Sequence, residues 1–175
     1  MPTTDADSRP GVLDRPDVER SRELIDEWDE RTLELQVELT EIPAPPFGEE
    51  VRAARVADHF RDFGLKDVRI DEVGNVVAEL PAGPDSLSEE GDSPPVIVVS
   101  AHLDTIFSEG TDVRVRREGD RLCGPGISDD GRGLAVLLTL GRLFVTLDLP
   151  LGKNLRFVAT VGEEGAGNLR GVRHL

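Results

Sequence analysis

The sequence predicts an α/β fold: a three-layer α/β/α sandwich with a mostly parallel sheet, incomplete within this chain. Helix-like and strand-like segments alternate after residue 48, which is typical of a sheet covered by helices on both faces. Residues 96–101 form a continuous apolar run, as expected for a strand buried on both faces. Residues 154–161 alternate between apolar and polar side chains, which favours another strand.

Two amphipathic helices are expected before the first strand. Apolar residues recur at helical spacing over residues 18–40 and again over residues 49–63. Prolines follow the first segment, and Gly64 is well placed to end the second. Residues 1–16 are polar and acidic with few apolar side chains, so we expect a disordered N-terminus followed by one domain over residues 17–175.

Short strand-like runs and two more helices complete the predicted elements. Two of the runs flank residues 72–74, and two more flank a turn at Gly119 that predicts a hairpin. Residues 81–95 are acidic and rich in proline and glycine, which predicts an exposed loop. The expected strands cover residues 68–71, 75–79, 112–117 and 121–123, and the expected helices cover residues 133–146 and 166–175.

The composition restricts the partners and the compartment. The 175 residues include 35 acidic and 20 basic side chains, which give a formal net charge of -15 at pH 7. This charge repels nucleic acid and anionic membranes, so neither is an expected partner. Cys123 is the single cysteine, which excludes an intrachain disulfide and favours a cytoplasmic setting. The longest apolar-rich run, residues 134–149, is too short and too interrupted to span a bilayer.

The first polar motif, SAHLDT at residues 100–105, directly follows an expected strand. His102 and Asp104 are two residues apart, so their side chains point the same way in an extended chain. His102 offers a ring nitrogen to a metal, and Asp104 offers an acceptor for the other ring N–H. Taken alone, the motif is explained more simply by a capped turn with a hydrogen-bonded histidine.

The second motif, GPGISDDGRG at residues 124–133, opens the expected Leu-rich helix. Its glycines permit a sharp turn and a close approach to a ligand. Asp129 and Asp130 lie next to a helix N-terminus, whose dipole favours their charge. Capping of the helix by either aspartate is the more direct interpretation of this motif alone. A phosphate-binding loop is disfavoured, because the Gly-Lys-Ser/Thr ending is missing and two aspartates repel phosphate.

Two further motifs contain adjacent acidic side chains. Glu163 and Glu164 follow the strand expected over residues 154–161, where one glutamate could bind a metal while its neighbour moves protons. The alternative is a pair of solvated surface acids. Residues 43–50, PAPPFGEE, either shape the rim of a pocket or form a stiff connection between helices, and the connection is favoured.

The motifs are more informative together than apart. Each lies just after an expected strand or just before an expected helix, so all of them are expected at one crevice of the α/β fold. Two like charges about 4 Å apart cost about 4 kcal/mol at an effective dielectric constant near 20. A pair of divalent metals removes this repulsion, and histidine with carboxylates is a ligand set that suits zinc. The acidic side chains expected there are Asp104, Asp129, Asp130, Glu163 and Glu164.

Three stretches in this order resemble a known group of enzymes. They are SAHLDT, GPGISDDGRG and VGEEGAGNLRG, at residues 100–105, 124–133 and 161–171. They are similar to the two-zinc metallopeptidases of family M20, which include peptidase T, carboxypeptidase G, aminoacylase, acetylornithine deacetylase and succinyl-diaminopimelate desuccinylase. LTEIPAPPFGEE at residues 39–50 is most similar to the peptidase T-like members.

The resemblance implies a set of metal ligands. His102 would bind one zinc, Glu164 would bind the second, and Asp129 would bridge the two. A cis peptide bond would follow the bridging residue, between Asp129 and Asp130. Cobalt or manganese would suit the same ligands.

The resemblance also implies the reaction and its catalytic residues. Asp104 would orient the histidine, and Glu163 would act as the general base. The expected reaction is hydrolysis of amide bonds in small peptides or N-acyl amino acids by a water held between two zinc ions.

Members of that family are much longer than this chain. The resemblance therefore predicts an N-terminal fragment of the catalytic domain, without the lid or dimerisation domain and without the remaining metal ligands. Such a fragment would bind zinc weakly and turn over little substrate, and a homodimer would be open only to a full-length form. A catalytically inactive remnant of the family is the alternative, and a magnesium-dependent phosphoryl-transfer protein is a weaker one, since carboxylate clusters also bind magnesium.

Overall fold

The chain contains both helices and strands, but among the described residues they alternate only from residue 131 onwards, and not from residue 48 as the sequence predicts. A computed structural model describes residues 11–83 and 95–175. The helical elements are η1 (Val12–Asp14), α1 (Pro16–Glu27), α2 (Asp29–Thr40), α3 (Glu50–Asp62), α4 (Gly131–Leu147), η3 (Gly165–Gly167) and α5 (Arg170–His174). The strands are β1 (Lys66–Ile70), β2 (Val76–Leu80), β3 (Val96–His102), β4 (Arg116–Glu118), β5 (Arg121–Cys123) and β6 (Asn154–Thr160).

The main sheet has the strand order β1-β2-β6-β3 and is mixed. The predicted α/β class is confirmed, but the sheet is not mostly parallel: β1 with β2 and β2 with β6 are antiparallel, and only β6 with β3 is parallel. The turn after β1 explains the difference. The Asp71 carboxylate accepts the backbone N–H groups of Val73, Gly74 and Asn75, which closes a short hairpin that can join only antiparallel strands. The parallel pair is joined by a longer crossover that contains α4.

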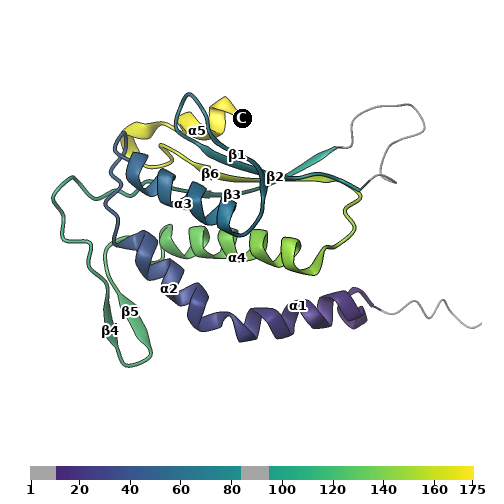
Figure 1. The fold of residues 1–175 in the computed structure, drawn as a ribbon. Helices are drawn as coiled ribbons and strands as arrows, with labels where there is room; N and C mark the ends of the chain where they lie inside the picture. Colours follow the sequence, from purple (N-terminus) through teal and green to yellow (C-terminus); the bar gives the residue numbers. More distant parts are fainter. Residues whose placement is uncertain (1–10, 84–94) are drawn as a thin grey trace, which may run out of the picture.

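Helices α1 to α4 lie on one side of the main sheet, and the short α5 lies on the other (Figure 1). Apolar side chains of α3 and α4 are buried against this face of the sheet, with Phe60, Leu138 and Phe157 fully inaccessible. The Phe157 ring lies between two others, 6.3 Å from the centroid of Phe60 and 6.4 Å from that of Phe144. Each such side chain stabilises the fold by about 1.5–3 kcal/mol relative to full exposure.

The strand predicted to be buried on both faces, β3, lies at an edge of the described sheet. Its N-terminal half is open: Val96, Ile97 and Val98 are 45%, 44% and 48% exposed. Among the described strands only β6 pairs with it. An apolar run predicts a strand but not which elements cover its two faces. The expectation of burial on both faces was wrong because, among the described helices, only the short α5 lies on the far side of the sheet.

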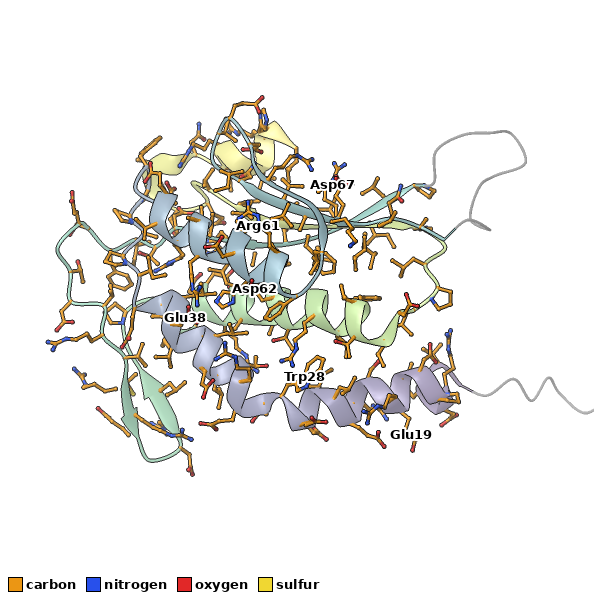
Figure 2. The ribbon with its side chains drawn as sticks, viewed as in Figure 1. Glu19, Trp28, Glu38, Arg61, Asp62 and Asp67 are labelled. Atoms are coloured by element: carbon orange, nitrogen blue, oxygen red, sulfur yellow. The ribbon has the colours of Figure 1, made fainter. Side chains whose placement is uncertain are left out.

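A single helix was expected over residues 18–40, and two are present. The chain bends at Trp28, which lies between α1 and α2 and whose φ of -95° and ψ of 5° are not helical. The Trp28 side chain is buried together with Leu24 and Leu143, and the Arg142 guanidinium carbon lies 3.9 Å from the centre of its ring. Trp28 therefore fills the space between the bend and α4, which lets both α1 and α2 contact the same helix (Figure 2).

Two expectations fall partly outside the described residues. Of the N-terminal segment expected to be disordered, residues 1–10 lie outside the description, and residues 11–16 are described. Val12–Asp14 form a short turn closed by the Gly11 N–H and the Asp14 carboxylate, and α1 begins at Pro16. Of the loop expected over residues 81–95, residues 84–94 are not described. Within the described residues, every helix is too short or too polar to cross a bilayer.

Candidate metal centre

The pairing of β3 with β6 brings two of the sequence motifs together. His102 at the end of β3 pairs in register with Thr160 at the end of β6, so the segment after β6 lies beside the histidine. Donor atoms of His102, Glu163 and Glu164 all lie within 4.8 Å of one another. His102 and Glu164 are half-buried and Glu163 is exposed. His102 is thus far from the two adjacent glutamates in the sequence, but the three side chains form one cluster of donor atoms that can bind a cation.

His102 is held at both ring nitrogens. Its Nδ1 lies 2.9 Å from the main-chain oxygen of Asp104, and its Nε2 lies 2.9 Å from Oδ1 of Asp129. A carbonyl oxygen can only accept, so Nδ1 donates there and Nε2 is the nitrogen left for a metal. Burial lowers the pKa of His102, but the carboxylates of Asp104, Asp130 and Asp129 outweigh burial and raise this pKa to about 9. A cation at Nε2 would therefore compete with a firmly held proton.

Asp104 is fully buried and holds the segment that carries the two glutamates. Its Oδ1 accepts the backbone N–H of Glu163 at 2.9 Å, and its Oδ2 accepts that of Glu164 at 2.8 Å. Burial raises the pKa of Asp104, but His102 and these two N–H groups lower it below its usual value. The carboxylate was expected to orient His102, yet its Oδ1 lies 3.7 Å from Nδ1, farther than the carbonyl oxygen of the same residue.

The two neighbouring aspartates of the second motif have different surroundings. Asp130 is the N-cap of α4: its Oδ1 accepts the N–H of Gly133 at 3.0 Å, and its Oδ2 accepts the backbone N–H of His102 at 2.9 Å. A Cβ at Gly133 would lie 2.0 Å from the capping oxygen, so only glycine fits there. Asp129 is not the cap: its side chain is 74% exposed, and it contacts the His102 ring. The peptide bond between the two aspartates is cis, as the resemblance implied.

Several residues that support the cluster were not predicted from the sequence. Gln36 on α2 donates to the main-chain oxygen of Ile127, which fixes the second motif. Arg52 on α3 is 1% exposed and donates to the main-chain oxygens of Ile42 and Leu103, next to His102. A polar side chain on the apolar face of a predicted helix is the signal that would have found Gln36 and Arg52, since such positions are rarely polar without a buried partner.

The charges around the cluster suit a cation. Burial and the charges of Asp129 and Glu163 raise the pKa of Glu164, and burial raises the pKa of Asp130. Burial is the larger cause of both shifts, and the neighbouring carboxylates add to it. One imidazole nitrogen with several carboxylate oxygens is the donor chemistry that zinc, cobalt and manganese accept. The side chains present therefore fit the metals that the sequence motifs implied.

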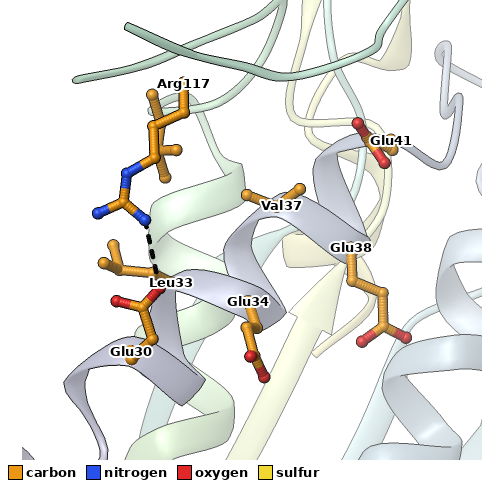
Figure 3. A pocket seen from close by; sticks show the side chains of 8 residues that line it. Glu30, Leu33, Glu34, Val37, Glu38, Glu41 and Arg117 are labelled. Carbon is orange, nitrogen blue, oxygen red and sulfur yellow. Dashed lines mark hydrogen bonds and ion pairs between the residues drawn. The ribbon is translucent and has the colours of Figure 1, made fainter. Parts of the chain in front are cut away.

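A cavity of about 150 Å³ lies next to this cluster. Asp129 and Glu164 line it together with Phe107 and the glycines of the second motif. A larger groove of about 390 Å³ lies between α2 and the β4–β5 hairpin (Figure 3). None of the clustered residues lines that groove, so the smaller cavity is the one that would hold a reacting group. The groove is lined by Glu30, Leu33, Glu34, Val37, Glu38, Glu41, Arg117 and Leu122.

Solved structures share this fold at low sequence identity. A tripeptidase from Staphylococcus aureus superposes with a TM-score of 0.67 at 24% identity, over 84% of this chain and 39% of that one. Human carnosine dipeptidase 1 superposes with a TM-score of 0.66 at 17% identity, over 90% of this chain and 36% of that one. A dinuclear metal-binding peptidase of family M20 from Bacillus subtilis gives a TM-score of 0.57 at 17% identity, over 83% of this chain and 41% of that one. This chain thus spans less than half the length of each.

The sequence also matches a defined peptidase family. The family model described as peptidase family M28 matches residues 75–175, more than half of the chain, and this range contains His102, Asp104, Asp129, Glu163 and Glu164. The fold of the solved structures, one of them an M20 peptidase, agrees with the metallopeptidase resemblance seen in the motifs. The resemblance is therefore confirmed at the level of a metallopeptidase, although the family whose model matches is not the M20 family that the motifs indicated: the chain belongs to peptidase family M28.

Proposed function

We propose that the cluster at the ends of β3 and β6 is a dinuclear zinc site that hydrolyses amide bonds in small peptides or N-acyl amino acids. The observation that carries the proposal is the convergence of His102, Glu163 and Glu164 within 4.8 Å, with Asp129 against the histidine ring. Two of the similar structures are named as a tripeptidase and a carnosine dipeptidase, which favours short peptides as substrates. The similar dinuclear peptidase favours a pair of metals.

His102, Asp129 and Glu164 are the residues that would hold the metals. When bound, a metal pair would polarise the scissile carbonyl and lower the pKa of a water towards about 7. The half-buried Glu164 suits a ligand, because its carboxylate lies within 4.8 Å of the donor atoms of His102 and Glu163. Asp129 suits a bridging position, because its exposed carboxylate already lies against Nε2 of His102.

Glu163 would move the proton during hydrolysis. It is the exposed member of the cluster, so its carboxylate can reach a substrate, while its neighbour Glu164 is half-buried. It would accept a proton from the attacking water and donate it to the leaving amine, a contribution of about 100- to 10,000-fold to the rate. Asp104 would support this by fixing the main chain of both glutamates. The single Cys123 favours a reducing, cytoplasmic setting for this chemistry.

Zinc titration and a peptide assay together test the proposal. The purified chain should bind zinc, and His102→Ala should weaken binding at least about 10-fold, because one ligand is lost. Release of amino acids from dipeptides and tripeptides should require zinc and fall about 100-fold or more in Glu163→Gln, which keeps the shape of the side chain.

The two measurements separate the alternatives. Zinc-dependent release of amino acids from dipeptides or tripeptides by this chain would exclude an inactive remnant of the family. Hydrolysis that is unchanged in Glu163→Gln would remove this residue as the base. A preference for magnesium together with phosphatase activity would replace the proposal with the phosphoryl-transfer alternative.

A further inference from the structure

A buried ion pair lies beside the segment that carries the two glutamates. Glu49 precedes the first turn of α3, and Arg170 is the first residue of α5. Oε2 of Glu49 lies 2.7 Å from Nη2 of Arg170, and the two side chains are only 3% and 23% exposed. The ring of Phe47 covers the guanidinium, 4.5 Å from its central carbon. The pair thus joins two motifs that are 121 positions apart in the sequence.

Stability alone explains this pair poorly. Within the described chain, the other carboxylate oxygen of Glu49 and Nη1 of Arg170 are buried and lack a hydrogen-bond partner. Both residues line a cavity of about 160 Å³ between α3 and the turn that joins β1 to β2. Burying two charges costs about as much as their attraction returns, and unpaired atoms add to the cost. A pair of this kind is therefore expected to have a role beyond holding the fold together.

The arginine lies directly against the main chain that precedes Glu163. A Cβ added at Gly162 would come within 2.2 Å of Nη1 and 2.9 Å of Cγ of Arg170, so the side chain is packed onto this residue. Gly162 has a φ of +64°, which glycine adopts without strain. The Asp104 carboxylate accepts the N–H groups of the next two residues. The glutamate segment, residues 162–169, thus has contacts to both Asp104 and Arg170 near its start.

We propose that Glu49 and Arg170 are positioning residues for Glu163 and Glu164. The ion pair fixes the Arg170 side chain, and the fixed side chain sets the path of Gly162. That path directs the next two N–H groups towards Asp104 and the two glutamate side chains towards His102. This inference rests on the proposed function for its purpose, but the contacts that it invokes exist without a metal.

Amide hydrogen exchange on the metal-free full chain tests the positioning directly. Glu49→Gln and Arg170→Lys each weaken the pair: the first removes the negative charge, and the second removes the planar group that packs on Phe47 and Gly162. Each should raise exchange at the amides of residues 163 and 164 about 10-fold, while amides within β6 keep their protection. The double variant should change exchange by less than the product of the single effects, since both act through one pair.

Glu50→Gln and Arg173→Gln are the matched controls, because both side chains are exposed neighbours on the same two helices. They should leave exchange at residues 163 and 164 unchanged. Equal acceleration at β6 and at residues 163–164 would show a purely structural anchor and overturn the inference, and so would unchanged exchange in both test variants.

Zinc affinity provides a second, separate measurement. The same two test variants should weaken zinc binding about 10- to 100-fold, as is typical when a residue that supports metal ligands is changed. A wild-type chain that binds no zinc would contradict the proposed function but leave the exchange result standing. Accelerated local exchange with unaltered zinc affinity would show that the pair holds the segment but does not position the ligands, which would overturn the inference alone.

Discussion

Asp104 shows how much one buried side chain can determine at this site. Both of its carboxylate oxygens are occupied by successive main-chain N–H groups, from Glu163 and Glu164. Its own carbonyl oxygen accepts from the His102 ring. Charged acceptors of backbone N–H groups form hydrogen bonds about twice as strong as neutral ones. The end of β3 and the segment after β6 are thus joined through a single residue.

Asp104→Asn should therefore disturb the site far more than its small change in shape suggests. An asparagine presents one acceptor and one donor, so one of the two main-chain N–H groups would face another donor. We expect a loss of about 1–3 kcal/mol in the free energy of unfolding, measured by urea denaturation, and zinc affinity weakened about 10- to 100-fold. Asp62→Asn, an exposed aspartate at the end of α3, is the control and should stay within about 0.5 kcal/mol of wild type. Equal values for the two variants would contradict this account of Asp104.

At the scale of elements, the N-terminus of α4 links helix capping to the metal centre. One oxygen of Asp130 caps the helix and the other accepts the backbone N–H of His102. Helix capping and metal binding were alternative interpretations of the same motif, and the structure assigns the capping to only one of the two adjacent aspartates. Asp130 performs the capping, and Asp129 is the one that faces the His102 ring.

Asp130→Ala should destabilise the chain by more than an ordinary lost cap. A cap contributes about 1 kcal/mol, and the unpaired N–H of His102 adds a further cost of about 1–3 kcal/mol. Asp130→Asn keeps an acceptor for the cap and should recover part of the loss. Thermal and urea unfolding measure both effects, with Ser128→Ala, an exposed neighbour, as the reference expected to be near neutral. A loss in Asp130→Ala no larger than that of the reference would show that the cap contributes little.

For the molecule as a whole, the open edge at β3 is the feature most exposed to misassociation. Among the described strands, β3 has one neighbour. Nearly half of the surface of each of its first three residues, Val96, Ile97 and Val98, is exposed. Unpaired edge strands with apolar side chains readily pair with other chains, and a lysine placed there blocks such pairing.

Val98→Lys should accordingly reduce concentration-dependent association. Light scattering at rising protein concentration should show fewer large species than for wild type, with a melting temperature that changes little, because the side chain is 48% exposed. Val136→Lys on α4, where the valine is 38% exposed, adds the same charge away from the edge and should not reduce association. If both variants reduce association equally, net charge and not the edge strand is responsible.

The sequence predicted the parts of this molecule that depend on local pattern. The α3 and α4 helices, the strands that flank residues 72–74, the hairpin at Gly119 and the strand β6 follow from apolar periodicity and from glycine at turns. The placement of His102, Glu163 and Glu164 followed from their position at strand ends, where parallel strands bring polar residues together.

The rest depends on contacts between distant residues. Whether β3 lies at the centre or the edge of a sheet, and whether the helical pattern before residue 40 bends at Trp28, are decided by what packs alongside. The pairing of Glu49 with Arg170 spans 121 positions, and no local pattern in either motif indicates the other.

The two hydrogen bonds from main-chain N–H groups to Asp104 affect which substitutions this site can accept. Since the carboxylate holds the backbone of residues 163 and 164 and touches neither of their side chains in these bonds, the conformation of the segment does not depend on the acids it presents. Substitutions at those two positions can alter reactivity and leave the scaffold intact. The side chains at positions 163 and 164 could therefore be replaced by others with different chemistry while the backbone keeps its conformation.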